Sequence, residues 1–167
     1  MAGMISQLIG LLNEQADRYE ELLGLSREKK DIIIANDVDG LQKITHLENL
    51  VVSQNQKLEK KRIAVLQDIA AVVNRKEEEL TLSALVAIME GQEEKEGLVS
   101  VGERIRRVME SLSEANLYNA SLIRNALDYI EYSMNVIRSS VSQIPAYYAG
   151  AGEGMTGEGP GIFDARH

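Results

Sequence analysis

Between residues 4 and 35, apolar residues recur at intervals of three and four, which is the spacing of one face of an α-helix. The segment Asn36–Gly40 interrupts this pattern, and Asp37 is the expected N-cap of a second helix over about residues 38–75. A connection this short places the two helices in an antiparallel hairpin. The stripe of the first helix comprises Ile5, Leu8, Ile9, Leu12, Ala16, Tyr19, Leu22, Leu23 and Ile33.

The second helix carries a seam in which spacings of three and four alternate, and some of its members are polar. These are Glu48, Asn55 and Arg62. Polar seam residues are typical of coiled coils, where they fix the register and the orientation of the partner helix. Glu48 is expected to form an ion pair with Lys29 or Lys30 of the first helix. The whole seam comprises Leu41, Ile44, Glu48, Val51, Asn55, Leu58, Arg62, Val65, Ile69 and Val72.

Two further helices are expected after a charged connection. Thr81 is the expected N-cap of a short amphipathic helix that Gly91 ends, and a third long helix covers about residues 93–141. We therefore predict an all-α fold: a long antiparallel helical hairpin plus a third long helix, in a three-helix coiled-coil-like bundle, with a short helix in the connection. The predicted domains are a helical domain over 1–141 and a Gly-rich flexible tail over 142–167.

The third long helix has an apolar stripe that contains two amides, Asn116 and Asn119. A buried amide costs stability unless a partner across the interface satisfies it, so both residues are predicted to be structural seam residues that select a partner helix. The apolar members of the stripe are Leu98, Val101, Ile105, Val108, Leu112, Ile123, Ala126, Ile130 and Ile137.

A second stripe appears in the C-terminal half of this helix and contains three tyrosines. One interpretation is that it widens the contact with the hairpin or with the short helix. The other is that it forms a groove for an amphipathic helix of a partner protein, because a tyrosine ring buries apolar area while its hydroxyl stays hydrated. The candidate partner-binding residues are Tyr118, Leu122, Asn125, Tyr129, Tyr132 and Val136.

Composition narrows the classes of partner. The chain has 167 residues, 44% of them hydrophobic, which suits one domain with a packed core. A formal charge of −8 disfavours binding to nucleic acid and to anionic membranes. There is no cysteine, no apolar run long enough to insert into a membrane and no basic leader segment, so a cytoplasmic location is expected.

Motifs that suggest chemistry have simpler explanations. Residues 152–157 match the GxGxxG pattern, but a Gly-rich stretch surrounds them where a dinucleotide site needs a strand and a helix. His46 belongs to no Glu-x-x-His pair, which disfavours a metal-binding bundle. No nucleophile is paired with a base. We therefore expect no enzymatic activity, no metal and no cofactor.

In the order and spacing of several segments, the chain resembles the FlgN-type flagellar export chaperones. The resemblance spans most of the helical part. It rests on the stretch Tyr19–Lys30, the Asn36-Asp37 break, Leu41-x-x-Ile44-x-x-x-Glu48, Leu58-x-x-x-Arg62, Asn116-x-x-Asn119-x-x-Leu122-Ile123, the continuation Ala126–Ile130 and the C-terminal Ile162–Arg166.

The resemblance implies a cytoplasmic, non-enzymatic helical chaperone. Such proteins bind the C-terminal amphipathic helices of hook–filament junction proteins, prevent their premature assembly and deliver them to the flagellar type III export apparatus. The family's client-binding part is its C-terminal region, so the resemblance carries this role to the second stripe. The oligomeric state is left open between a monomer and a weak homodimer. The alternative is a structural or signalling coiled-coil bundle with no export role.

Overall fold

The computed structural model describes residues 1–142. The predicted tail, the GxGxxG match and the C-terminal segment of the family resemblance lie outside these residues. The chain divides into two units, Met1–Ala126 and a second unit that begins at Leu127.

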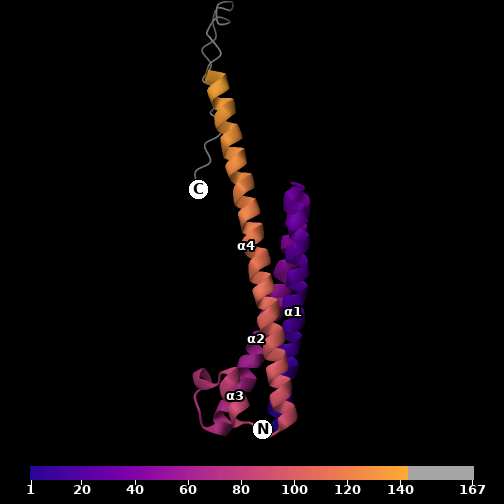
Figure 1. Cartoon of the computed structure of the whole chain (residues 1–167), viewed down its shortest axis with the longest axis vertical. Coiled ribbons are helices and arrows are strands. Elements are labelled where there is room, and N and C mark those ends of the chain that lie inside the picture. The colour runs from indigo at the N-terminus through magenta and orange to yellow at the C-terminus, as the bar shows by residue number, and fades with distance from the viewer. Residues whose placement is uncertain (143–167) are drawn as a thin grey trace, which may run out of the picture. The chain divides into compact units, whose positions relative to one another are not determined.

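Helices account for the regular structure in residues 1–142, which contain no strand, so the all-α prediction is confirmed. The order along the chain is α1 (Ala2–Ile34), α2 (Val38–Val73), the single 3₁₀ turn η1 (Glu77–Glu79), α3 (Leu82–Ile88) and α4 (Gln92–Ser142) (Figure 1). The observed ends of the three long helices lie within about two residues of the predicted ones, which is the usual spread of helix assignment.

Local chemistry accounts for most of the helix ends. Asn36 has a left-handed backbone with a φ of 54°, and the side chain of Asp37 accepts a hydrogen bond from the Gly40 amide at 2.9 Å. The expected cap of α3 is also present, since Thr81 Oγ1 accepts from the Ala84 amide at 3.2 Å. These contacts satisfy amides that the first turn of a helix leaves without partners.

The end of α3 differs from the prediction. The helix ends at Ile88, three residues before Gly91, because Met89 adopts an extended backbone with a ψ of 140°. The Met89 side chain is buried in the hydrophobic core. Packing of this side chain thus accompanies the end of the helix before the glycine is reached.

The hydrophobic core lies at one end of the first unit. It gathers the first half of α1, the second half of α2, α3 and the start of α4. It includes the buried residues Ile5, Leu8, Leu11, Leu12, Leu58, Val65, Ile69, Ala70, Leu80, Leu85, Met89, Leu98 and Val101.

One predicted seam residue of α2, Val72, is outside this core and is 58% exposed. Its neighbours Ala70, which is buried, and Val73, which is half-buried, face the core instead. A straight α-helix drifts relative to a seven-residue repeat, so the buried face rotates away from the seam toward the helix end.

Two glycines permit close helix contacts within the first unit. A Cβ on Gly97 would lie 3.0 Å from Ile9 Cδ1 of α1, and a Cβ on Gly102 would collide with the Leu82 side chain of α3. The start of α4 therefore lies against α1 on one side and α3 on another (Figure 1).

Candidate partner-binding surface

Contacts along α1 and α4 show that the two helices run parallel within the first unit. Ile9 meets Gly97, Asp17 and Glu20 meet Arg104, and Ser26 meets Asn119 further along both helices. Only eight residues of α1 follow Ser26, so this register ends close to the last residues of the first unit.

Arg104 forms the most extensive ion-pair cluster between α1 and α4. Its Nη2 lies 2.6 Å from Asp17 Oδ1, its Nε lies 2.9 Å from Glu20 Oε1, and its Nη1 donates to Asn13 Oδ1 at 3.2 Å. The hydrogen bond from Arg104 lowers the pKa of Glu20, and the two carboxylates raise the pKa of the guanidinium. These groups are largely exposed, so the cluster aligns the helices more than it stabilises them.

Ser26 of α1 forms hydrogen bonds with both amides of the α4 stripe. Its hydroxyl donates to Asn116 Oδ1 at 2.9 Å, and Asn119 Nδ2 donates to the Ser26 carbonyl at 2.8 Å and to Ser26 Oγ at 3.1 Å. Ser26 is 1% and Asn119 is 4% exposed. Both amides have a hydrogen-bond partner on α1, although Asn119 Oδ1 is buried with no partner within residues 1–142. Asn116 is exposed, which corrects its assignment to a buried stripe.

Sequence reasoning missed Ser26 because the residue was not part of the apolar pattern of α1. The position of Ser26 in the sequence nevertheless indicates that it faces another helix. Ser26 follows Tyr19 by seven residues and Leu22 by four, so it lies on the same face as the predicted stripe. A small polar residue on such a face is a natural partner for an amide on the facing helix.

The polar seam residues of α2 have different environments. The expected ion pair of Glu48 is present, with Lys29 Nζ 2.8 Å from Glu48 Oε2. Arg62 instead pairs with Glu59, one turn away on α2 itself. Arg62 Nε and Asn55 Oδ1 are buried and have no hydrogen-bond partner within residues 1–142. The seam is thus tied to α1 at Glu48 and left partly unsatisfied at Asn55 and Arg62.

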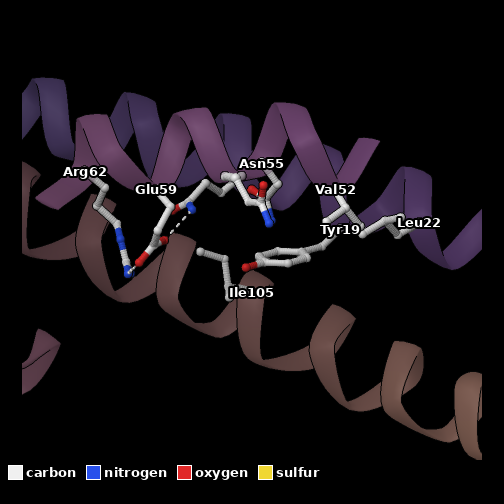
Figure 2. A pocket seen from close by; sticks show the side chains of 9 residues that line it. Tyr19, Leu22, Val52, Asn55, Glu59, Arg62 and Ile105 are labelled. Atoms are coloured by element: carbon white, nitrogen blue, oxygen red, sulfur yellow. Dashed lines mark hydrogen bonds and ion pairs between the residues drawn. The ribbon is translucent and has the colours of Figure 1, made fainter. Parts of the chain in front are cut away.

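These unsatisfied atoms border a cavity of about 420 Å³ between α1, α2 and α4, shown in Figure 2. Gln15 of α1 donates to Glu59 at 2.9 Å on one side, and Tyr19 extends toward Ile105 on the other. Partial burial acts to raise the pKa of Glu59, but the hydrogen bonds from Gln15 and Arg62 outweigh it and lower that pKa. The two unsatisfied polar atoms therefore lie beside open space and not against another side chain.

We define the tyrosine face as Tyr118, Leu122, Asn125, Tyr129, Tyr132 and Val136, which follow one another at intervals of four and three. In the first unit, Tyr118 and Asn125 are exposed and Leu122 is half-buried. In the second unit, Tyr129 and Tyr132 are 72% and 68% exposed, and Val136 is exposed as well. The backbone is one continuous α-helix over all six positions.

A second apolar face of the same helix is exposed in the second unit. We define the isoleucine face as Leu127, Ile130, Met134, Ile137 and Val141, which are all exposed. Ile130 and Ile137 were expected to continue the buried stripe, and this expectation is wrong. Helical spacing predicts the side of the helix on which apolar residues lie, but it does not predict whether another helix covers that side.

Within residues 1–142, no group of three or more His, Cys, Asp or Glu side chains is arranged to hold a metal ion. None of the helices in this part of the chain is long and apolar enough to cross a membrane.

Comparison with known proteins gives one result. The model of the FlgN protein family matches residues 1–154. No curated protein and no solved structure shows significant similarity to the chain.

Proposed function

The chain belongs to the FlgN family of flagellar export chaperones, and from this premise we propose a specific client and binding surface. The client is the C-terminal amphipathic helix of a hook–filament junction protein, and it docks on the tyrosine face of α4. The complex keeps the client from assembling prematurely in the cytoplasm and presents it to the flagellar type III export apparatus.

The observation that carries the proposal is the exposure of the tyrosine face. Tyr118, Tyr129 and Tyr132 lie on one side of a continuous helix and are all more than half exposed. An amphipathic client helix needs such an apolar strip, and tyrosine and other aromatic residues dominate binding energy at interfaces. Asn125 interrupts the strip near its middle and offers both a donor and an acceptor to a polar client residue.

A chaperone must also release its client. A strip with a polar interruption and hydrated hydroxyl groups gives moderate affinity, because part of the buried area is polar. In this proposal the first unit, interpreted as a three-helix coiled-coil-like bundle, supplies a rigid support, and no cofactor takes part. The free chaperone is a monomer or a weak homodimer.

Titration of the purified protein with a synthetic client helix tests the proposal. Truncating a binding tyrosine at a well-packed interface costs about 2 kcal/mol or more, so changing both Tyr129 and Tyr132 to Ala should weaken binding by about a hundredfold or more. The matched control changes Asp128 and Asn135 to Ala, since both lie on the polar side of the same helix stretch. Equal affinity of the two double variants, with helicity retained, would refute the proposal.

The competing interpretation is a structural or signalling coiled coil with no export role. It requires the tyrosine face to be buried in a stable homodimer. The two interpretations differ in the solvent accessibility of Tyr129 and Tyr132, which tyrosine-selective labelling measures as the protein concentration rises. Protection that appears only when the client helix is added supports the chaperone.

A further inference from the structure

The isoleucine face has the pattern of a coiled-coil seam and is a surface separate from the tyrosine face. Its residues follow one another at intervals of three, four, three and four, so they occupy alternating core positions of a heptad repeat. All five are apolar, without the polar interruption that Asn125 makes on the tyrosine face. Taking about 100° per residue, the centres of the two faces are roughly 120° apart around α4.

Eight of the 15 residues over 127–141 therefore belong to one of these two faces. A helix needs only one stripe, roughly 100° wide, to pack against one neighbour. A single client helix on the tyrosine face would leave the isoleucine face in water. Exposed contiguous apolar surface of this kind marks an interaction site.

We propose that the isoleucine face binds the same face of a second copy of this chain, in an antiparallel coiled coil. In this arrangement Ile130 of one copy lies opposite Val141 of the other, and Met134 lies opposite Ile137. The two-fold symmetry repeats each pairing, which gives four apolar layers. The proposal does not rest on the chaperone function, because it uses none of the residues of the tyrosine face.

Charge complementarity favours a second copy of this chain as the partner and favours this register of the two helices. Glu131 and Arg138 lie seven residues apart along one edge of the isoleucine face. In the proposed register Glu131 of each copy faces Arg138 of the other, so two interchain ion pairs form. Neither side chain belongs to an ion pair within residues 1–142. The other edge of the face carries Ser133 and Ser140, which add no charge to the interface.

Alternative registers are electrostatically worse. If the helices shift so that Leu127 lies opposite Ile137 of the other copy, Glu131 faces Glu131 of the other copy and Arg124 faces Arg138 of the other copy. Both of these contacts join like charges. In a parallel pair, the charged edge of one helix faces the serine edge of the other, so no ion pair forms. Charged residues at these flanking positions set partner choice and orientation in coiled coils.

A charge-swap experiment on the full-length protein tests this arrangement. Sedimentation velocity should show a concentration-dependent dimer for the unaltered chain. Glu131→Arg places an arginine opposite Arg138 of the other copy, and Arg138→Glu places a glutamate opposite Glu131 of the other copy. Each variant alone should dimerise about tenfold more weakly, since two attractive pairs become repulsive.

The decisive sample is an equimolar mixture of the two variants. In the mixed dimer, both facing positions are arginine in the Glu131→Arg chain and glutamate in the Arg138→Glu chain, so two attractive pairs form again and the mixture should recover the dimer. Capture of an untagged variant by a tagged one would show that it is a heterodimer. Arg124→Glu is the control for register and should dimerise as the unaltered chain does.

Three results would overturn the proposal. The first is an unaltered chain that stays monomeric up to high micromolar concentration. The second is a mixture of the two charge variants that associates no better than either variant alone. The third is a dimer that Arg124→Glu disrupts while Glu131→Arg leaves it intact. Circular dichroism on each variant excludes loss of helix as the cause.

Discussion

The two ends of α4 both carry aliphatic residues at helical spacing, but in opposite environments. Leu98 and Val101 near the start are buried in the core, whereas Ile130 and Ile137 near the end are exposed. Both pairs follow helical spacing and consist of aliphatic side chains. The comparison shows that one helix buries aliphatic side chains in the core at one end and leaves them exposed at the other, where we propose binding surfaces.

The largest expected difference is between equivalent truncations at the two ends. Leu98→Ala should lower the free energy of unfolding by about 2–5 kcal/mol, because Leu98 is 0% exposed and its removal leaves a cavity. Ile130→Ala should change it by no more than about 0.5 kcal/mol. Urea denaturation at a concentration where the chain is monomeric measures both. Similar losses of unfolding free energy in the two variants would show that the two ends of α4 contribute equally to stability, which would contradict the comparison.

The polar contact between α1 and α4 allows a second, smaller test. Asn119→Ala removes the donor to Ser26 and should cost about 1–3 kcal/mol, because a buried group loses its partner. Asn116→Ala should cost less, since Asn116 is exposed and water can replace it. A larger loss for Asn116→Ala would show that burial of Asn119 does not make it the stronger of the two contacts to Ser26.

Acid titration addresses the ion-pair cluster of Arg104. The pKa of Glu20 is lowered in the folded chain from 4.5, so its contribution to stability is present above that value and is lost as the pH falls below it. Arg104→Leu should therefore make the denaturation midpoint less sensitive to pH below about 4.5. The measurement is the urea midpoint between about pH 6 and pH 3 in low salt. If the urea midpoint of Arg104→Leu falls with decreasing pH as steeply as that of the unaltered chain, the cluster contributes nothing to stability.

The smallest expected effect has the opposite sign. Asn55 Oδ1 is buried without a partner beside the cavity of Figure 2, so Asn55→Leu should raise the free energy of unfolding by about 0.5–1 kcal/mol. Thermal unfolding is sensitive enough to detect such a change. A destabilised variant would indicate that ordered water satisfies Asn55 in solution.

Sequence patterns predicted the helices and their caps well, because these depend on neighbours along the chain. Asp37 and Thr81 cap their helices as expected, and Glu48 meets Lys29. These features follow from turn chemistry and from the geometry of a hairpin, both of which are local.

The failures concern what covers a helix face. Val72, Ile130 and Ile137 were assigned to buried stripes and are exposed. The period of a pattern does not report where a neighbouring helix ends, and the drift between 3.5 and 3.6 residues per turn accumulates along helices of this length. The predicted role of the tyrosine face remains a prediction for the same reason, since binding depends on a second molecule.

The confinement of the core cluster to residues 5–101 has a consequence for how such a chain can diverge. Under the two binding proposals above, substitutions in the exposed last turns of α4 would alter what the protein recognises at almost no cost to its fold. A lineage could therefore exchange one client or one dimer partner for another by point changes alone, while selection for foldability acts on a different set of positions.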